Sequence, residues 1–229
     1  MPASHALIKG MLEALNTTYL VAGLIISAIP VIHYPFGWFE TLFHELSHGL
    51  AAIFTGGSIE SIALDLDGAG LCATSGGNGF LILVLGYTGS ALWGSLVYLS
   101  VSLAKAGSAK IIALILAIIV VFVSILWARD IITLGILLVI IGLFYAAYLY
   151  GSHQSTRYFV EFIGIYVVLN AIRSPLSLVD GRDIGDGGAL SEMTRIPEII
   201  WIMIWSLFAV ACLMLLYFRS VKNSRCSTV

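Results

Sequence analysis

Two histidines and a glutamate stand close together in the segment His44-Glu45-Leu46-Ser47-His48. On a helix, residues i and i+4 lie on the same face about one turn apart, so His44 and His48 can present two imidazole nitrogens to one Zn²⁺. Glu45 then lies beside them, where the general base of a zinc hydrolase belongs. The spacing therefore predicts zinc-assisted hydrolysis, with His44 and His48 as metal ligands and Glu45 as the catalytic base.

The residues around this motif help to separate a metal site from a chance match. In unrelated proteins the same pattern can be a plain histidine pair on a helix face, with the glutamate paired to a neighbour. Here the flanking residues 38–43 and 49–54 are strongly apolar. Ionisable residues in apolar spans are costly and tend to be functional. Three of them within five positions predict a metal site at or within a bilayer.

The composition is that of an integral membrane protein. Hydrophobic residues make up 59% of the chain and charged residues 10%, far from the globular norm of roughly a quarter charged, and the mean hydropathy is +1.01. At about 20 residues per span, the 229 residues leave room for six or seven helices and no separate soluble domain. We expect one multi-pass domain, residues 1–229, in the cell membrane. No basic run suggests nucleic acid as a partner.

Apolar runs and the breaks between them give the expected helices. The charged pair Arg129-Asp130 divides a long apolar run into two spans with a tight connection; one bent helix with a buried ion pair is the alternative. Residues 33–37 and 151–157 are expected to be a break and a loop. The expected apolar segments are 19–32, 38–55, 80–104, the two halves of 111–150, 158–172 and 199–218. The metalloprotease core would comprise about 37–104 and 158–197.

Residues 58–75 break the helical pattern. Alternation over 62–67, a glycine-rich turn and the segment 71–74 predict a small β-hairpin. The expected fold class is therefore an all-α polytopic membrane protein with six or seven transmembrane helices and a small β-hairpin between the second and third. Small residues in the span 80–104 would let that helix approach the one that carries the histidines.

A catalytic zinc site needs a third protein ligand from elsewhere in the chain. Acidic and histidine side chains near the spans supply the candidates, which are Asp130, His153, Asp180, Asp183 and Asp186. Gly187-Gly188 after Asp186 would let the backbone bring that carboxylate close to a metal, although the same residues also suit a surface turn. Spacing alone does not choose among them.

Several blocks of sequence spread over most of the chain match the pattern of one family. They are residues 43–57 around the paired histidines, 62–70 followed by Gly76-Gly77, 86–94, and Asn170 with 186–190 and 194–197. On these blocks the chain resembles the site-2 protease class of intramembrane zinc metalloproteases, and within it the small peptidase M50B-like branch.

The resemblance implies further roles for two residues. In that family a late aspartate is the third zinc ligand, and an asparagine upstream of it lies near the substrate. Carried over, this makes Asp186 the ligand and Asn170 a substrate or oxyanion contact. The family commonly has a compact Asn-x-x-Pro-x-x-x-x-Asp-Gly, whereas Asp186 lies sixteen positions after Asn170. Asp180, which is followed by Gly181, fits that spacing better and is the alternative ligand.

The resemblance also implies the activity. We expect an intramembrane zinc metalloprotease that hydrolyses peptide bonds in or near transmembrane segments of membrane-protein substrates, with the lipid bilayer as its surroundings. The substrate helix would have to unwind, because a helical peptide bond is shielded, and the hairpin would bind it as an added strand. The alternative is a non-catalytic membrane protein, either metal-binding or transporting, or a client-binding pseudoprotease. Glu45 disfavours pure ion binding, which needs no base.

Overall fold

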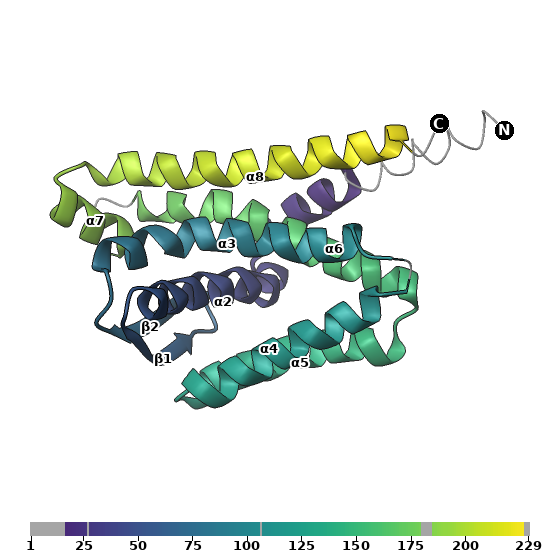
Figure 1. The fold of residues 1–229 in the computed structure, drawn as a ribbon, viewed down its shortest axis with the longest axis horizontal. Helices are drawn as coiled ribbons and strands as arrows, with labels where there is room; N and C mark the ends of the chain where they lie inside the picture. Colours follow the sequence, from purple (N-terminus) through teal and green to yellow (C-terminus); the bar gives the residue numbers. More distant parts are fainter. Residues whose placement is uncertain (1–16, 27, 106, 180–184, 227–229) are drawn as a thin grey trace.

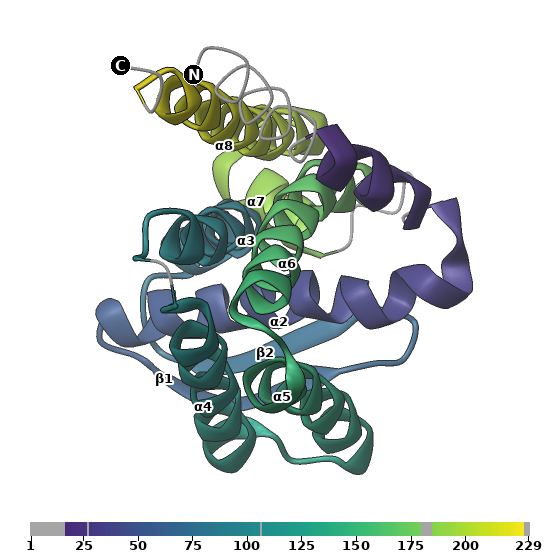
Figure 2. The same ribbon diagram turned by 90° about the vertical axis from the view of Figure 1, so that its right-hand side faces the viewer.

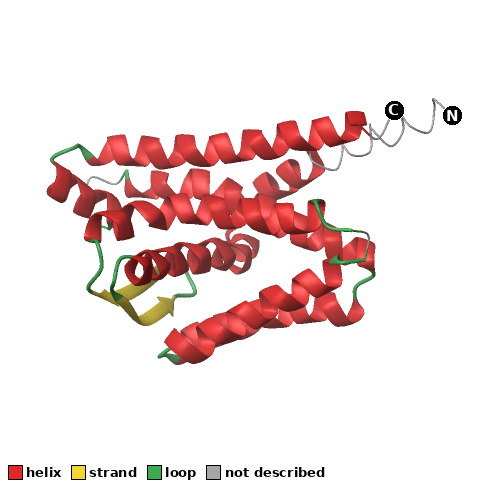
Figure 3. Ribbon diagram, in the orientation of Figure 1, coloured by secondary structure: helices red, strands yellow, loops and turns green. Residues whose placement is uncertain are grey.

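The computed structural model describes residues 17–226 apart from 27, 106 and 180–184. Helices make up nearly all of it, and one two-stranded sheet is added (Figure 3). After a short helix at Thr17–Ile26, the elements in chain order are α2 (Pro30–Phe54), β1 (Ser58–Leu64), β2 (Gly70–Ser75), α3 (Gly79–Ser102), α4 (Ala109–Trp127), α5 (Ile131–Tyr150), α6 (His153–Arg173), the 3-10 turn η1 (Ser174–Leu178), α7 (Asp186–Thr194) and α8 (Glu198–Cys226).

The chain is a multi-pass membrane protein. Within the described residues, five helical segments are long and apolar enough to cross a bilayer: α3, α4, α5, α6 with η1, and α8. That number is close to the six or seven expected, and α2 and the short apolar helix Thr17–Ile26 are further helical segments. The predicted class, a helical membrane protein with a hairpin between its second and third helices, is confirmed.

The helices stack in layers with α3 near the middle. α8 lies on one side, α3 and α6 come next, then α2, and the hairpin and the α4–α5 pair lie on the far side (Figures 1 and 2). α3 and α6 approach so closely that a Cβ atom on Gly164 would lie 2.5 Å from the Tyr98 backbone nitrogen. Small residues permit this approach of two backbones.

The hairpin is fixed to the α4–α5 pair through β1. Its strands pair antiparallel from Ser58 opposite Ser75 to Leu64 opposite Gly70. Ile62 and Leu64 are buried in the core, and the Leu64 backbone N–H donates to Thr133 Oγ1 at 2.8 Å. In the described part of the chain, β2 has a strand partner on one side only.

The structure supports two of the expected boundaries. α2 ends at Phe54, just before Gly56, whose φ of 90° is the left-handed conformation that closes many helices. The long apolar run 111–150 is two helices, because α4 ends at Trp127 and α5 starts after Asp130. The Asp130 carboxylate accepts from the Thr133 backbone N–H at 2.8 Å and caps α5. That cap rules out the single bent helix.

Two other expected boundaries are wrong. The break expected at 33–37 lies inside α2, which begins at Pro30 and continues through Pro35. Proline suits a first helical turn, and in membrane proteins neighbouring groups can satisfy the carbonyl that an internal proline leaves free. The loop expected at 151–157 is mostly helix, since α6 begins at His153. Ser152 caps it by accepting from the Ser155 backbone N–H at 3.0 Å, so these polar residues start a helix.

The contact between α3 and α6 gives a prediction about stability. Gly164→Ala places a methyl group against the Tyr98 backbone, and overpacking of this kind costs roughly 1–3 kcal/mol. Gly142→Ala on α5 is the matched control, because nothing lies within 4 Å of its added Cβ atom. Thermal unfolding in detergent should show a lower midpoint for Gly164→Ala and an unchanged or higher one for Gly142→Ala. Equal midpoints would show that the helices are not packed this closely.

Candidate metal and catalytic site

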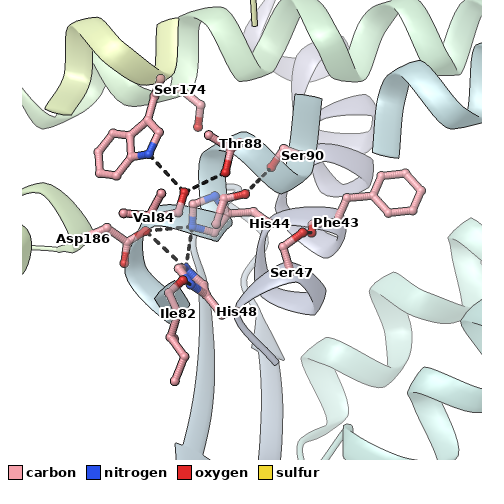
Figure 4. Close-up of polar contacts among 12 residues, drawn as sticks. Phe43, His44, Ser47, His48, Ile82, Val84, Thr88, Ser90, Ser174 and Asp186 are labelled. Atoms are coloured by element: carbon pink, nitrogen blue, oxygen red, sulfur yellow. Dashed lines mark hydrogen bonds and ion pairs between the residues drawn. The ribbon is translucent and has the colours of Figure 1, made fainter. Parts of the chain in front are cut away.

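Two imidazoles and a carboxylate from distant parts of the chain meet in the helical bundle. Asp186 Oδ2, from the first residue of α7, lies 3.1 Å from His44 Nε2 and 3.2 Å from His48 Nε2. The two Nε2 atoms are 2.9 Å apart (Figure 4). The three side chains offer ligand atoms that all lie within 4.8 Å of one another. The arrangement can hold one metal ion.

The chemistry of these donors fits zinc. Two imidazole nitrogens and one carboxylate oxygen are a ligand set of catalytic zinc sites, which leave a fourth position open. His48 Nδ1 lies 2.7 Å from the Ile82 carbonyl oxygen, which can only accept. Nδ1 therefore donates its hydrogen to this carbonyl, and Nε2 is the atom that faces Asp186 and His44. Such an outer hydrogen bond orients a metal-binding histidine and fixes its tautomer.

The close approach of α3 to α2 shapes the site. A Cβ atom on Gly86 would lie 2.5 Å from His48 Cε1 and 2.8 Å from His44 Cε1. One on Gly89 would collide with the Ser47 side chain. Any side chain at position 86 would therefore displace the imidazoles. The small residues of this span serve the site as well as the packing of the helices.

Asp186 reaches the histidines because of the turn that precedes it. Gly185 has a φ of 88°, a left-handed conformation that costs glycine little. Burial alone would raise the pKa of Asp186, but hydrogen bonds and charges from His44 and His48 outweigh it and hold that pKa well below its usual range. The carboxylate is therefore the charged form that a metal would bind.

The other candidate ligands lie elsewhere or outside the described residues. Asp130 caps α5, and His153 begins α6. Neither belongs to the group formed by Asp186 and the two histidines. Asp180, the alternative to Asp186, and Asp183 lie outside the described residues.

Glu45 is buried and lines the same cavity as the three possible ligands, a space of about 520 Å³. A Cβ atom on Gly70 would lie 2.5 Å from Glu45 Oε1, so the start of β2 lies directly against this carboxylate. Cys72 of β2 also faces the cavity. Burial, with the charge of Glu45 nearby, raises the pKa of the Cys72 thiol to about 12, which keeps the thiol neutral.

Asn170 occupies a second chamber of about 310 Å³ beside the metal cavity. The two spaces share Glu40, Thr41 and Ser174 in their walls. Asn170 is buried, and its side-chain nitrogen donates to the Tyr166 carbonyl oxygen at 3.2 Å. The residue therefore lies next to the site without lining the cavity that holds the histidines.

Sequence reasoning missed two residues of the cavity wall. Glu40 is buried, and its Oε1 has no hydrogen-bond partner among the described residues. Its position one turn before His44 was a signal that could have placed it on the same helix face. Tyr87 packs edge-on against His44, with ring centroids 4.3 Å apart. It follows Gly86 in a block that the sequence had singled out only for family resemblance.

Fold and site together define a multi-pass membrane protein with a histidine–histidine–aspartate group that can hold a metal ion. The sequence model of the family described as Peptidase M50B-like matches residues 17–216. That match covers most of the chain, which therefore belongs to the Peptidase M50B-like family, a metal-dependent peptidase family. No curated protein and no solved structure matches the chain.

The geometry predicts which substitutions release metal from the purified protein. His44→Ala, His48→Ala and Asp186→Asn should each reduce the affinity for zinc. Loss of a hydrogen-bond partner of a ligand costs roughly 10–100-fold in metal affinity, and loss of a ligand itself should cost more. Asp130→Asn is the matched control and should bind zinc normally. Titration with a zinc indicator measures all four variants.

Asp180→Asn in the same titration decides between the two aspartates. Normal zinc affinity is expected, because Asp186 already faces the histidines. Loss of zinc from Asp180→Asn, with normal binding by Asp186→Asn, would contradict the assignment.

Proposed function

We propose that this protein is an intramembrane zinc metalloprotease that hydrolyses peptide bonds in or near transmembrane segments of membrane-protein substrates. The observation that carries the proposal is the meeting of His44, His48 and Asp186 on one wall of a cavity that Glu45 also lines. Membership of a peptidase family supports it. The contact between His44 and Asp186 joins residues 142 positions apart, which supports a built site over a chance histidine pair.

His44, His48 and Asp186 would hold the zinc ion. Bound there, Zn²⁺ would supply a water of lowered pKa and polarise the scissile carbonyl. The three side chains come from α2 and α7, two helices that a third helix, α3, contacts. A site built on packed helices holds its ligands in place before substrate arrives.

Glu45 would move the protons of the reaction. Its carboxylate accepts a proton from the water as the water oxygen attacks the peptide carbonyl carbon. The same proton then passes to the leaving amide nitrogen as the carbon–nitrogen bond breaks. A positioned acid–base group of this kind contributes about 10²–10⁴-fold. Burial beside the histidines and against Gly70 keeps the carboxylate where the attack would occur.

β2 would bind the substrate in extended form. Leu71, Cys72 and Thr74 of this strand line the cavity, and β1 is its strand partner on the other side. An unwound segment could pair with the free edge of β2 through main-chain hydrogen bonds. Since Gly70 touches Glu45, a strand added there would pass beside the general base. Asn170 in the adjoining chamber would contact the same segment further along.

Replacing the base separates a protease from a metal-binding or client-binding protein. Glu45→Gln removes the proton acceptor but leaves the three ligands, so it should bind zinc normally and cleave a reconstituted model transmembrane substrate at least 10²-fold more slowly. Glu60→Gln, an exposed position of β1, should cleave like the wild type. Cleavage is followed by electrophoresis of the substrate in proteoliposomes. Normal cleavage by Glu45→Gln would sink the mechanism.

Photocrosslinking tests the role of β2. A benzoylphenylalanine at Thr74, which lines the cavity, should crosslink to substrate trapped by the Glu45→Gln variant. The same group at Glu60, on the exposed side of β1, is the control and should crosslink weakly. Equal yields from the two positions, measured by mass spectrometry, would indicate that the hairpin has only a structural role.

A further inference from the structure

Tyr87 of α3 forms part of the wall of the metal cavity. The residue is 8% exposed, and its ring lies between two others. On one side it meets His44 edge-on, at an interplanar angle of 71°. On the other it packs against Trp205, with ring centroids 4.7 Å apart. The phenol is therefore held beside a proposed metal ligand with little freedom to move.

The Tyr87 hydroxyl has a polar neighbour at the edge of the cavity, the side chain of Ser174. A buried phenol O–H ordinarily has a hydrogen-bond partner. Here the Ser174 side chain is that partner, and both residues line the metal cavity. Tyr87 lines the same cavity as Asp186 and Glu45, which places it among the groups of the site.

The other donors around the cavity are mostly engaged. Thr41 Oγ1 donates to the Gly68 carbonyl at 2.8 Å, and Ser177 Oγ donates to the Ser174 carbonyl at 2.7 Å. No lysine or arginine is among the described residues that line this space. Few side chains are therefore left to donate a hydrogen bond to negative charge in the cavity. Among them, Tyr87 is held in place between two rings.

We propose that Tyr87 is a further catalytic residue, whose hydroxyl donates a hydrogen bond to the carbonyl oxygen of the scissile peptide as negative charge develops there. The inference rests on the proposed proteolytic function. When the water oxygen bonds to the carbonyl carbon, the π electron pair moves onto the carbonyl oxygen and Glu45 takes the water proton. Tyr87 keeps its own proton throughout. A fixed hydrogen-bond donor to this carbonyl oxygen raises kcat by about 10²–10³-fold.

The surrounding contacts hold the phenol in place in advance. Trp205 Nε1 donates to the Val84 carbonyl at 3.2 Å, and Thr88 Oγ1 donates to the same oxygen at 2.8 Å (Figure 4). These bonds tie the indole that supports Tyr87 to the helix that carries it. Gly86, the residue before it, touches both imidazoles. One turn of α3 thus sets the position of the ligands and of the donor together.

Asn170, the residue that family resemblance offers as an oxyanion contact, is placed less well for that role. It lies in the second chamber rather than in the cavity with the histidines, and one of its two amide hydrogens is donated to the Tyr166 carbonyl. A substrate contact away from the reacting carbonyl suits its position better. The two residues would therefore have separate tasks.

Tyr87→Phe tests the hydroxyl while the ring packing on His44 and Trp205 is kept. In zinc-loaded full-length protein in proteoliposomes, kcat should fall about 10²–10³-fold, with KM and bound zinc unchanged. Tyr145→Phe, at a half-exposed position of α5, is the control. An unchanged kcat, or a loss of zinc or thermal stability that accounts for the change, would overturn the assignment.

A binding measurement gives a second readout that needs no turnover. A phosphinic peptide with the cleaved sequence imitates the charged tetrahedral oxygen, so Tyr87→Phe should weaken its binding by a similar factor. Binding of the uncleaved substrate to Glu45→Gln should not change when Tyr87→Phe is added. Equal phosphinic-peptide affinity for Tyr87→Phe and wild type overturns the inference alone. Absence of any Glu45-dependent cleavage by the wild type overturns the proposed function, and this inference with it.

Discussion

The contact of one half-buried carboxylate with two buried imidazoles is the interaction on which the site depends. His44, His48 and Asp186 lie in a helical bundle where isolated charges would be costly. They are tolerated because the carboxylate lies close to both imidazoles, as buried charges require. The contact joins α2 to α7 across most of the chain. It also fixes the wall of the cavity in which Glu45 and Tyr87 lie.

Helix α3 makes this arrangement possible because it has glycines where it packs against α2 and against α6. Gly86 and Gly89 face α2, where side chains would strike His44, His48 or Ser47. Gly94 faces α6, and a Cβ atom there would lie 2.8 Å from the Gly164 carbonyl oxygen. The helix therefore packs against two neighbours at backbone distance. Its position then determines where Tyr87 and the Ile82 carbonyl meet the imidazoles.

Residue spacing, strand alternation and helix capping predicted those parts of the fold that depend on neighbouring residues in the sequence. The spacing of His44 and His48 placed both on one helix face, and the alternation after residue 60 gave the hairpin. Asp130 ended one helix and capped the next. The same local reasoning failed where a polar or helix-breaking residue has a different tertiary role. Pro35 lies inside a helix, and Ser152 begins one that had been expected only after a loop.

Long-range parts of the site were harder to predict. The family resemblance pointed to Asp186, whereas the compact spacing after Asn170 fitted Asp180 better, and the course of α7 brings Asp186 to the histidines. Tyr87 gave no signal of chemistry, because a tyrosine in an apolar span commonly belongs to a packing face. Its proposed role follows from its ring contact with His44 and from the cavity that it shares with Asp186 and Glu45. Helix packing determines which residues become neighbours, and the residue pattern of a single segment does not specify that packing.

X-ray absorption at the zinc edge of the purified protein tests the central claim most directly. We predict one zinc per chain, bound by nitrogen and oxygen at about 2.0–2.2 Å, with the outer scattering of two imidazoles. His48→Ala should remove one imidazole contribution from whatever zinc remains. Absence of stoichiometric zinc, or sulfur ligands at about 2.3 Å, would contradict the account.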